Sequence, residues 1–262
     1  MEILLFSQFF LLRQFVVREM SSRYQGSLLG GLWWILTPLL MLAIFTLVFH
    51  GIFGMKWPGA QTSSPIEFAL FLFVGLGVFQ MVSEVWSKAP LLISQQPNLV
   101  TKVVFPLWIL PLSSTVASAL GWLAGLVLLL TLAAWTNDVF ASWLLLPFML
   151  LPIVLIVAGV GLALSAVGVF WRDLAHIMAM SMTGLMFLSP IFYPIASVPM
   201  SWQFWFNLNP LTLMIEPLRE IILFGQVPSV HSWLILYVMA FISVLLGMWL
   251  FKRLKPGFAD VM

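Results

Sequence analysis

The chain has 262 residues, of which 62% are hydrophobic and 8% are charged, and its formal net charge is +2. Soluble domains carry about 25% charged residues, because a water-facing surface needs them. The composition therefore excludes an ordinary soluble protein and indicates an integral membrane protein, while the absence of cysteine excludes disulfides and thiolate metal sites.

The N-terminal segment, residues 1–30, is predicted to form an amphipathic helix at the cytoplasmic membrane surface. Apolar residues recur at helical spacing among polar ones, and the segment carries arginines that suit anionic lipid. A signal peptide is excluded, because the acidic Glu2 precedes the apolar run and no small-residue cleavage site follows it.

Six apolar segments follow, and a helix of about 20 residues is enough to cross the hydrocarbon core of a bilayer. They are 32–53, 68–82 (or to 86 if Glu84 lies at the interface), about 103–135, 140–171, 174–192 and 233–251. The sequence thus predicts an all-α integral membrane protein with six transmembrane helices over residues 31–253 and a cytoplasmic tail at 254–262.

The charges predict the orientation of these helices. Six spans place nine of the 11 Lys and Arg residues on one side of the membrane, and only Lys56 and Arg219 on the other. Positively charged loops are retained in the cytoplasm, so both termini are predicted to be cytoplasmic.

Residues 88–106, after the second span, are predicted to be a cytoplasmic loop with a short helix. Prolines bracket short helical pieces, and Asn98 is a suitable N-cap for a helix that begins at Leu99. Such a helix has the right shape to enter a groove on a soluble partner, although a plain connecting turn is the alternative.

The stretch between the last two spans, about 193–230, is apolar but repeatedly interrupted by proline. We expect re-entrant helices that enter the outer leaflet and return, which is possible where the turn is buried in protein or lines a cavity. An interfacial helix anchored by Trp202 and Trp205 is the alternative. Glu216, Arg219 and Glu220 lie on one short predicted helix and are expected to pair, either as a periplasmic gate or as a salt bridge that keeps the segment folded.

The motifs of catalysis and metal binding are absent from the sequence. His50, His176 and His231 stand alone, which argues against a metal site. There is no G-x-S-x-G nucleophile motif and no G-x-x-x-x-G-K-[ST] phosphate-binding loop. We therefore expect no catalytic residue and no cofactor in this chain, and any work driven by ATP must come from another polypeptide.

Two further features of the sequence can be interpreted: a ridge of small residues on the third predicted span, and several aromatic residues, which are taken up below. The ridge consists of Ser113, Ala117, Gly121 and Gly125, spaced by four. Small residues allow helices to approach closely, either within one chain or across a dimer.

Several motifs occur in order along nearly the whole chain. They are Arg18-Glu19, Arg23-Tyr24, Ser27-Leu28-Leu29-Gly30, Leu32-Trp33, Asn98-Leu99-Val100-Thr101-Lys102, Phe105-Pro106, Arg172-Asp173-Leu174, Ser189-Pro190-Ile191-Phe192-Tyr193, Asn209-Pro210-Leu211, and Glu216 with Arg219. In these motifs the chain resembles type-2 ABC exporter permeases. It is most similar to the branch that exports lipid-linked polysaccharide, namely O-antigen, capsule or teichoic acid.

The resemblance implies a homodimeric permease in the bacterial cytoplasmic (inner) membrane, paired with two copies of an ATP-binding subunit that holds ATP and Mg. It implies a polysaccharide on a polyprenyl diphosphate carrier as substrate, with membrane lipid around the protein and no nucleic acid. Coupling to the ATPase would fall to Asn98, Leu99, Lys102 and Arg172. The carrier diphosphate, or ordinary lipid headgroups, would contact Arg13, Arg18 and Arg23.

We further hypothesise that aromatic rings line the transport path, because they offer many weak contacts to sugars. The candidates are Trp34, Phe45, Phe49, Phe187, Phe192 and Tyr193. Packing and the aromatic belt of the membrane interface are the alternatives. Two other functions stay open: a type-2 ABC exporter of a drug or small lipid, and an intramembrane glycan-processing enzyme, for which only Glu216 and Glu220 could serve.

Overall fold

A computed structural model describes residues 2–22, 30–57, 64–102, 104–136 and 139–261, with the side chains of all of these except 2–7, 34 and 35. Its regular elements within these ranges are all helical. The helices of the bundle are α1 (Glu2–Ser22), α2 (Trp33–Phe45), α3 (Pro65–Lys88), α5 (Ile109–Thr136), α6 (Leu146–Phe170), α7 (Leu174–Phe187) and α10 (Val230–Leu254). The segments between and after them contain α4 (Pro97–Thr101), α8 (Met200–Leu208), α9 (Pro210–Ile222) and α11 (Phe258–Val261).

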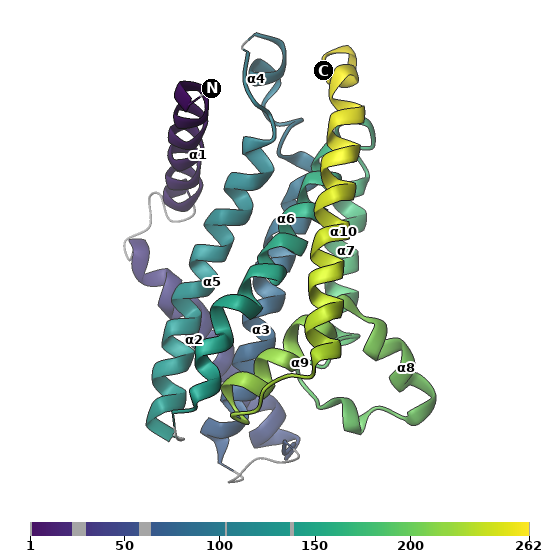
Figure 1. Ribbon diagram of the computed structural model, residues 1–262. Helices are drawn as coiled ribbons and strands as arrows, with labels where there is room; N and C mark the ends of the chain where they lie inside the picture. Colours follow the sequence, from purple (N-terminus) through teal and green to yellow (C-terminus); the bar gives the residue numbers. More distant parts are fainter. Residues whose placement is uncertain (1, 23–29, 58–63, 103, 137–138, 262) are drawn as a thin grey trace.

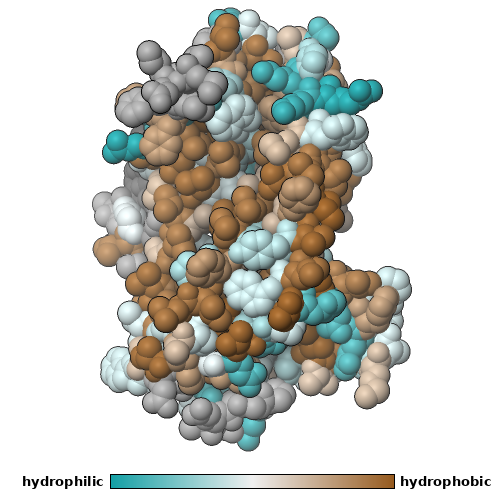
Figure 2. All heavy atoms as spheres, in the orientation of Figure 1, coloured by the Kyte–Doolittle hydropathy of each residue, from teal (hydrophilic) through white to brown (hydrophobic). Residues whose placement is uncertain are grey.

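Five helical stretches among these residues are long and apolar enough to cross a membrane: 30–52, 65–91, 109–136, 141–170 and 230–261. They overlap five of the six predicted spans. The remaining predicted span corresponds to α7, a shorter apolar helix of 14 residues. Figure 2 agrees with this composition, since hydrophobic side chains cover the middle of the face shown and hydrophilic ones gather toward its ends.

The two ends of the bundle hold different parts of the chain (Figure 1). Both termini and α4 lie at one end, here called the termini end. Helices α8 and α9 lie at the opposite end, here called the α9 end, where α8 projects sideways from the bundle. The placement of both termini at one end agrees with the predicted topology.

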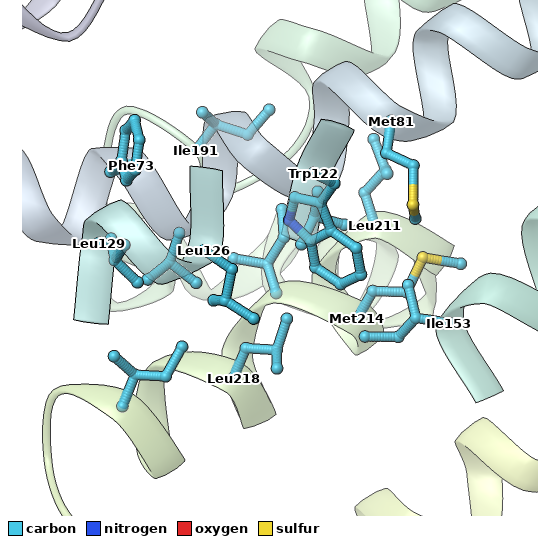
Figure 3. Close-up of a cluster of buried hydrophobic side chains, with 14 of the residues drawn as sticks. Phe73, Met81, Trp122, Leu126, Leu129, Ile153, Ile191, Leu211, Met214 and Leu218 are labelled. Atoms are coloured by element: carbon cyan, nitrogen blue, oxygen red, sulfur yellow. The ribbon is translucent and has the colours of Figure 1, made fainter. Parts of the chain in front are cut away.

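Helix α3 is the centre of the bundle. Its N-terminus is capped by Ser64, whose hydroxyl accepts a hydrogen bond of 3.1 Å from the Glu67 amide. Along its length Leu72, Val78 and Val82 are completely buried. Side chains from α5, α6 and α9 complete this core, including Trp122, Leu126, Ile153 and Leu218 in Figure 3.

The tightest helix contact joins α6 and α10. A Cβ added to Gly247 would lie 2.1 Å from the carbonyl oxygen of Gly159, and one added to Gly159 would lie 2.4 Å from the carbonyl carbon of Ser243. Only very small residues permit this backbone contact. The predicted ridge on α5 has no equivalent contact at Gly125, where an added Cβ meets no atom within 4 Å.

A second apolar cluster lies at the termini end. It consists of Ile93, Leu107, Leu110, Ala166, Val169, Phe251 and Phe258. Phe258 is only 1% exposed, and its ring lies 5.7 Å from that of Phe251 and 6.0 Å from that of Phe170. The predicted C-terminal tail is therefore helical over most of its length and packs against the bundle.

Helix α1 packs on α5 and on the loop after α3. Val16 is buried, the ring of Phe15 lies 5.1 Å from that of Phe105, and Lys88 lies 3.5 Å from Glu19. Phe9, Phe10 and Val17 are exposed, so the apolar residues of α1 do not all share the buried face. In Figure 1 the helix runs beside α5, and its predicted place at the membrane surface stays a prediction.

Candidate functional site

The α9 end contains a completely buried arginine, Arg219. All five of its N–H groups have acceptors. Nε donates to the Phe71 carbonyl at 3.3 Å, and Nη2 donates to the carbonyls of Phe71 and Ile191, each at 3.1 Å. Nη1 donates to the Pro190 carbonyl at 2.6 Å and to the Glu216 carboxylate at 2.7 Å. A guanidinium has five N–H donors, so this one is fully satisfied.

The surroundings of Arg219 are shaped for its guanidinium. Its Cζ lies 4.3 Å from the centre of the Trp57 ring, in a cation–π contact. A Cβ added to Gly75 would lie 3.0 Å from Nη2 of Arg219 and 3.3 Å from Cα of Ile191, so a glycine leaves room for both. Arg219 thereby ties α9 to α3 and to the turn that follows α7.

The three charged residues predicted to pair on this helix, Glu216, Arg219 and Glu220, have different surroundings in the structure. Arg219 pairs with Glu216, as the sequence predicted, and the Glu216 side chain is 34% exposed. Burial raises the pKa of Glu220, and the charge of Glu216 raises it further. The backbone acceptors of Arg219 were not predicted, because every residue has a backbone carbonyl and the sequence does not indicate which of them accepts a hydrogen bond. Whether these residues act as a gate stays a prediction.

The turn after α7, residues 188–193, is held at several further points. Asn209 caps α9 by accepting a hydrogen bond of 2.9 Å from the Leu211 amide. Its side-chain amide also donates to the Leu188 carbonyl at 3.0 Å and to the Ser189 hydroxyl at 2.9 Å. The Tyr193 hydroxyl donates to the Phe187 carbonyl. These bonds fix the position of Phe192, which lies in the same turn.

Four of the six aromatic residues predicted to line a path form one cluster. The buried ring of Phe192 lies 4.8 Å from that of Phe49, 5.0 Å from that of Phe45 and 6.0 Å from that of Phe187. Phe187 is 56% exposed, whereas Phe192 is buried within the chain. Tyr193 instead contacts Phe206 at 6.2 Å. The side chain of Trp34 lies outside the described residues, and the path itself stays a prediction.

Phe49 belongs to a stretch that the sequence did not predict to be unusual. Residues Thr46–Ile52 form a π-helix that continues α2. Within it, Nδ1 of His50 lies 3.1 Å from the carbonyl oxygen of Met55. π-Helical turns are rare and occur often at functional sites, because they re-aim side chains relative to an α-helix.

The short helix predicted in the loop after the second span is present as α4, at the termini end, and its role in coupling stays a prediction. It begins at Pro97, with Gln96 before it, so the predicted N-cap at Asn98 was wrong. Proline is favoured at the first position of a helix, which explains the earlier start. Asn98 and Lys102 are exposed, Leu99 packs on the second cluster, and Arg172 is exposed in the turn between α6 and α7.

The loop that carries α4 is firmly seated on α6. A Cβ added to Gly168 would lie 2.3 Å from the carbonyl oxygen of Pro90 and 2.4 Å from its Cα. The Trp86 indole donates a hydrogen bond of 3.3 Å to the Val157 carbonyl, and Ile93 is completely buried. The segment that precedes α4 is therefore in direct contact with the end of α6.

The arginines predicted to meet a diphosphate or lipid headgroups belong to the N-terminal segment. Arg13 and Arg18 are exposed, and Cζ of Arg18 lies 4.2 Å from the centre of the Phe15 ring. Arg23 lies outside the described residues. Within the described part of the chain, no group of three or more His, Cys, Asp or Glu residues could hold a metal ion.

Comparisons with known proteins match most of this chain. Residues 11–223 match the family model described as ABC-2 type transporter. The chain is 27% identical to the O-antigen export system permease protein RfbA of Klebsiella pneumoniae, over 94% of this chain and 92% of that protein. It is 26% identical to the protein of the same name from Myxococcus xanthus, over 95% and 94%. It is 25% identical to the polysialic acid transport protein KpsM of Escherichia coli, over 90% of each.

Proposed function

The chain belongs to the ABC-2 type transporter family, and from this premise we propose that it is the permease subunit of an ATP-driven polysaccharide exporter. Its substrate is a polysaccharide on polyprenyl diphosphate, with O-antigen as the first candidate and capsule as the second. The observation that carries the proposal is similarity over nearly the full length to permeases named for O-antigen export and polysialic acid transport. A permease of this family is not itself an enzyme.

In this proposal α7 also crosses the membrane, which brings the number of crossings to six; it is the fifth of them in chain order. At 1.5 Å per residue its 14 residues span about 21 Å, less than a hydrocarbon core of about 30 Å. The turn that follows extends it, and Ile191 and Phe192 in that turn are buried. Its path from the termini end toward α8 in Figure 1 supports a crossing. With six crossings, the charge distribution puts both termini in the cytoplasm of a bacterial cell, beneath the inner membrane.

The segment between α7 and α10 is proposed to be periplasmic and partly re-entrant. Buried Leu211, Ile215 and Leu218 hold α9 against the bundle core. By contrast, Trp202 and Trp205 on α8 are exposed, and α8 projects from the bundle in Figures 1 and 2. Re-entry thus fits α9, and an interfacial position fits α8.

Energy would come from two copies of a cytoplasmic ATP-binding subunit that holds ATP and Mg, acting on a homodimer of this chain. The proposed contact consists of Asn98 and Leu99 on α4, Lys102 directly after it, and Arg172 in the turn between α6 and α7. The close approach of Gly168 to Pro90 and the hydrogen bond from Trp86 to Val157 join the segment before α4 to α6, which supports transmission along this route. Arg13, Arg18 and Arg23 would meet the carrier diphosphate or lipid headgroups at the same membrane face.

The aromatic cluster is the proposed wall of the transport path. Phe187 is the member best placed to touch a glycan, because more than half of its surface is exposed. Phe192 contacts the Phe187 ring, and Phe45 and Phe49 in turn pack on Phe192. Aromatic faces bind sugar C–H groups weakly and broadly, so a chain can slide past them.

The test is a bacterial strain that makes the polysaccharide but lacks this chain. We expect lipid-linked polysaccharide to accumulate on the cytoplasmic side, and surface polysaccharide to return when the wild-type chain is supplied. Unchanged surface polysaccharide, with altered resistance to drugs or altered lipid export, would contradict the proposal and favour the small-substrate exporter. Polysaccharide that reaches the surface with altered chain length would favour the processing enzyme.

A further inference from the structure

A cavity of about 490 Å³ lies between α2, α3 and α5. Met186 of α7 and Leu218 and Ile222 of α9 contribute to its wall. Trp122, Leu126 and Leu129, which Figure 3 shows among the core side chains, line it from α5. The volume falls within the range of roughly 300–1,000 Å³ that is typical of ligand sites.

The cavity is long and narrow. Its lining extends along α2 from Trp33 to Phe45, along α3 from Phe73 to Glu84, and along α5 from Ser118 to Leu129. Each of these stretches measures about 17 Å at the helical rise, so the volume corresponds to a mean cross-section of about 30 Å². This is a slot roughly one hydrocarbon chain wide, parallel to the helices.

The chemistry of the lining changes along the slot. Toward the α9 end it is apolar, with Phe45, Phe73 and Leu129. Toward the termini end it includes the polar side chains Gln80, Ser83, Glu84, Thr37 and Ser118. Glu84 is bonded to Lys88 at 3.1 Å, so its charge is compensated. A ligand that fits this order has an apolar tail and a polar head.

The small residues of α5 keep the slot open. Gly121 and Gly125 line it, and a Cβ added to Gly125 meets no atom within 4 Å. Of the ridge that the sequence predicted to bring helices together, Ser113 and Ala117 are buried in the bundle, whereas Gly121 and Gly125 leave space beside α5. The slot is also open at its rim, where Gln80 is exposed and Met41 is half-exposed.

We propose that this slot binds one acyl chain of a phospholipid, with the headgroup toward the termini end. Five stretches within the described residues are suited to cross a bilayer, so phospholipid chains surround the protein at the highest local concentration. An apolar space open to the bilayer is filled by such chains, because filling restores the dispersion contacts that a void forfeits. The bound chain forms part of the contact between α2 and its neighbours. The inference does not depend on which substrate is exported.

Native mass spectrometry of the full-length permease, purified in detergent without added lipid, tests the proposal. The informative variant is Gly125→Phe, whose ring fills the slot. The matched control is Val127→Phe on the same helix, because Val127 is 62% exposed and outside the cavity lining. We expect the wild type and Val127→Phe to retain one more phospholipid per chain than Gly125→Phe. Equal lipid counts in all three proteins would overturn the proposal.

A second measurement tests the proposal even if the Gly125→Phe variant does not fold, because the slot is filled only after folding. Because the sequence lacks cysteine, Gly125→Cys can be folded with lipid bound and then reacted with a bulky maleimide. We expect release of one phospholipid per labelled chain, and no release from labelled Val127→Cys. Polyprenyl phosphate or diphosphate as the released species would overturn the assignment to phospholipid and identify the carrier lipid as the occupant.

Discussion

Replacing Arg219 with lysine keeps the positive charge but removes the planar donor group that links α9 to α3 and to the 188–193 turn. Lysine has three N–H donors against the five that arginine uses here, so at least two hydrogen bonds are lost. Hydrogen bonds of charged groups contribute about 1.5–3 kcal/mol each. Loss of two therefore costs about 3–6 kcal/mol, and we expect the lower end because the lysine head can shift toward the best acceptors.

A loss of about 3 kcal/mol in the free energy of unfolding lowers the melting temperature by roughly 6–12 °C for a domain of this size. The measurement is thermal unfolding of the purified protein in detergent, followed by size-exclusion chromatography. Glu216→Gln is the matched control. It keeps a hydrogen-bond acceptor, and the Glu216 side chain is one-third exposed, so we expect a loss below about 1 kcal/mol. An unchanged melting temperature for Arg219→Lys would refute the reasoning.

Three further outcomes follow from the structure. Phe187→Leu should slow glycan export while basal ATP hydrolysis and the melting temperature of the complex stay unchanged. Phe192→Leu, at a buried ring, should instead lower the melting temperature. Equal effects of the two variants would contradict the assignment of Phe187 to glycan contact and of Phe192 to packing. Gly168→Ala should weaken the coupling of ATP hydrolysis to export, because its Cβ would meet the Pro90 backbone at 2.3 Å, whereas Gly184→Ala, which meets no atom within 4 Å, should not. A single cysteine at Gln95 should react with a membrane-impermeant reagent only from the cytoplasm, and one at Val227 only from outside. The reverse pattern would contradict the predicted topology.

Five of the six predicted spans overlap helical stretches of the described residues that are long and apolar enough to cross a membrane, but the bounds differ in places. The second span was expected to end near 82–86, but its helix continues to Lys88, which pairs with Glu84 at 3.1 Å. The third was expected from about residue 103, whereas α5 begins at Ile109. The apolar residues before it, such as Leu107, belong to the second cluster at the termini end. A hydropathy pattern cannot distinguish burial in protein from burial in lipid.

The sequence predicted which residues belong to the candidate site better than it predicted how they are arranged. The pairing of Arg219 with Glu216 follows from their helical spacing, and it is present. The carbonyls of Phe71, Pro190 and Ile191 come from segments distant in sequence, so no local pattern announces them. The π-helix that carries Phe49 was likewise not predicted from any local pattern. Aromatic composition indicated the cluster around Phe192, but only the fold brings its rings into contact.

The burial of Phe258 has a consequence for the order in which the molecule assembles. Among the buried members of the second cluster, Phe258 comes last in chain order and is therefore the last to be synthesised, yet it completes the cluster under the loop that carries α4. Earlier helices can insert and pack while synthesis continues, but this cluster closes only after α10 has been made. The surface proposed to receive the ATPase therefore matures later than the helices that cross the membrane.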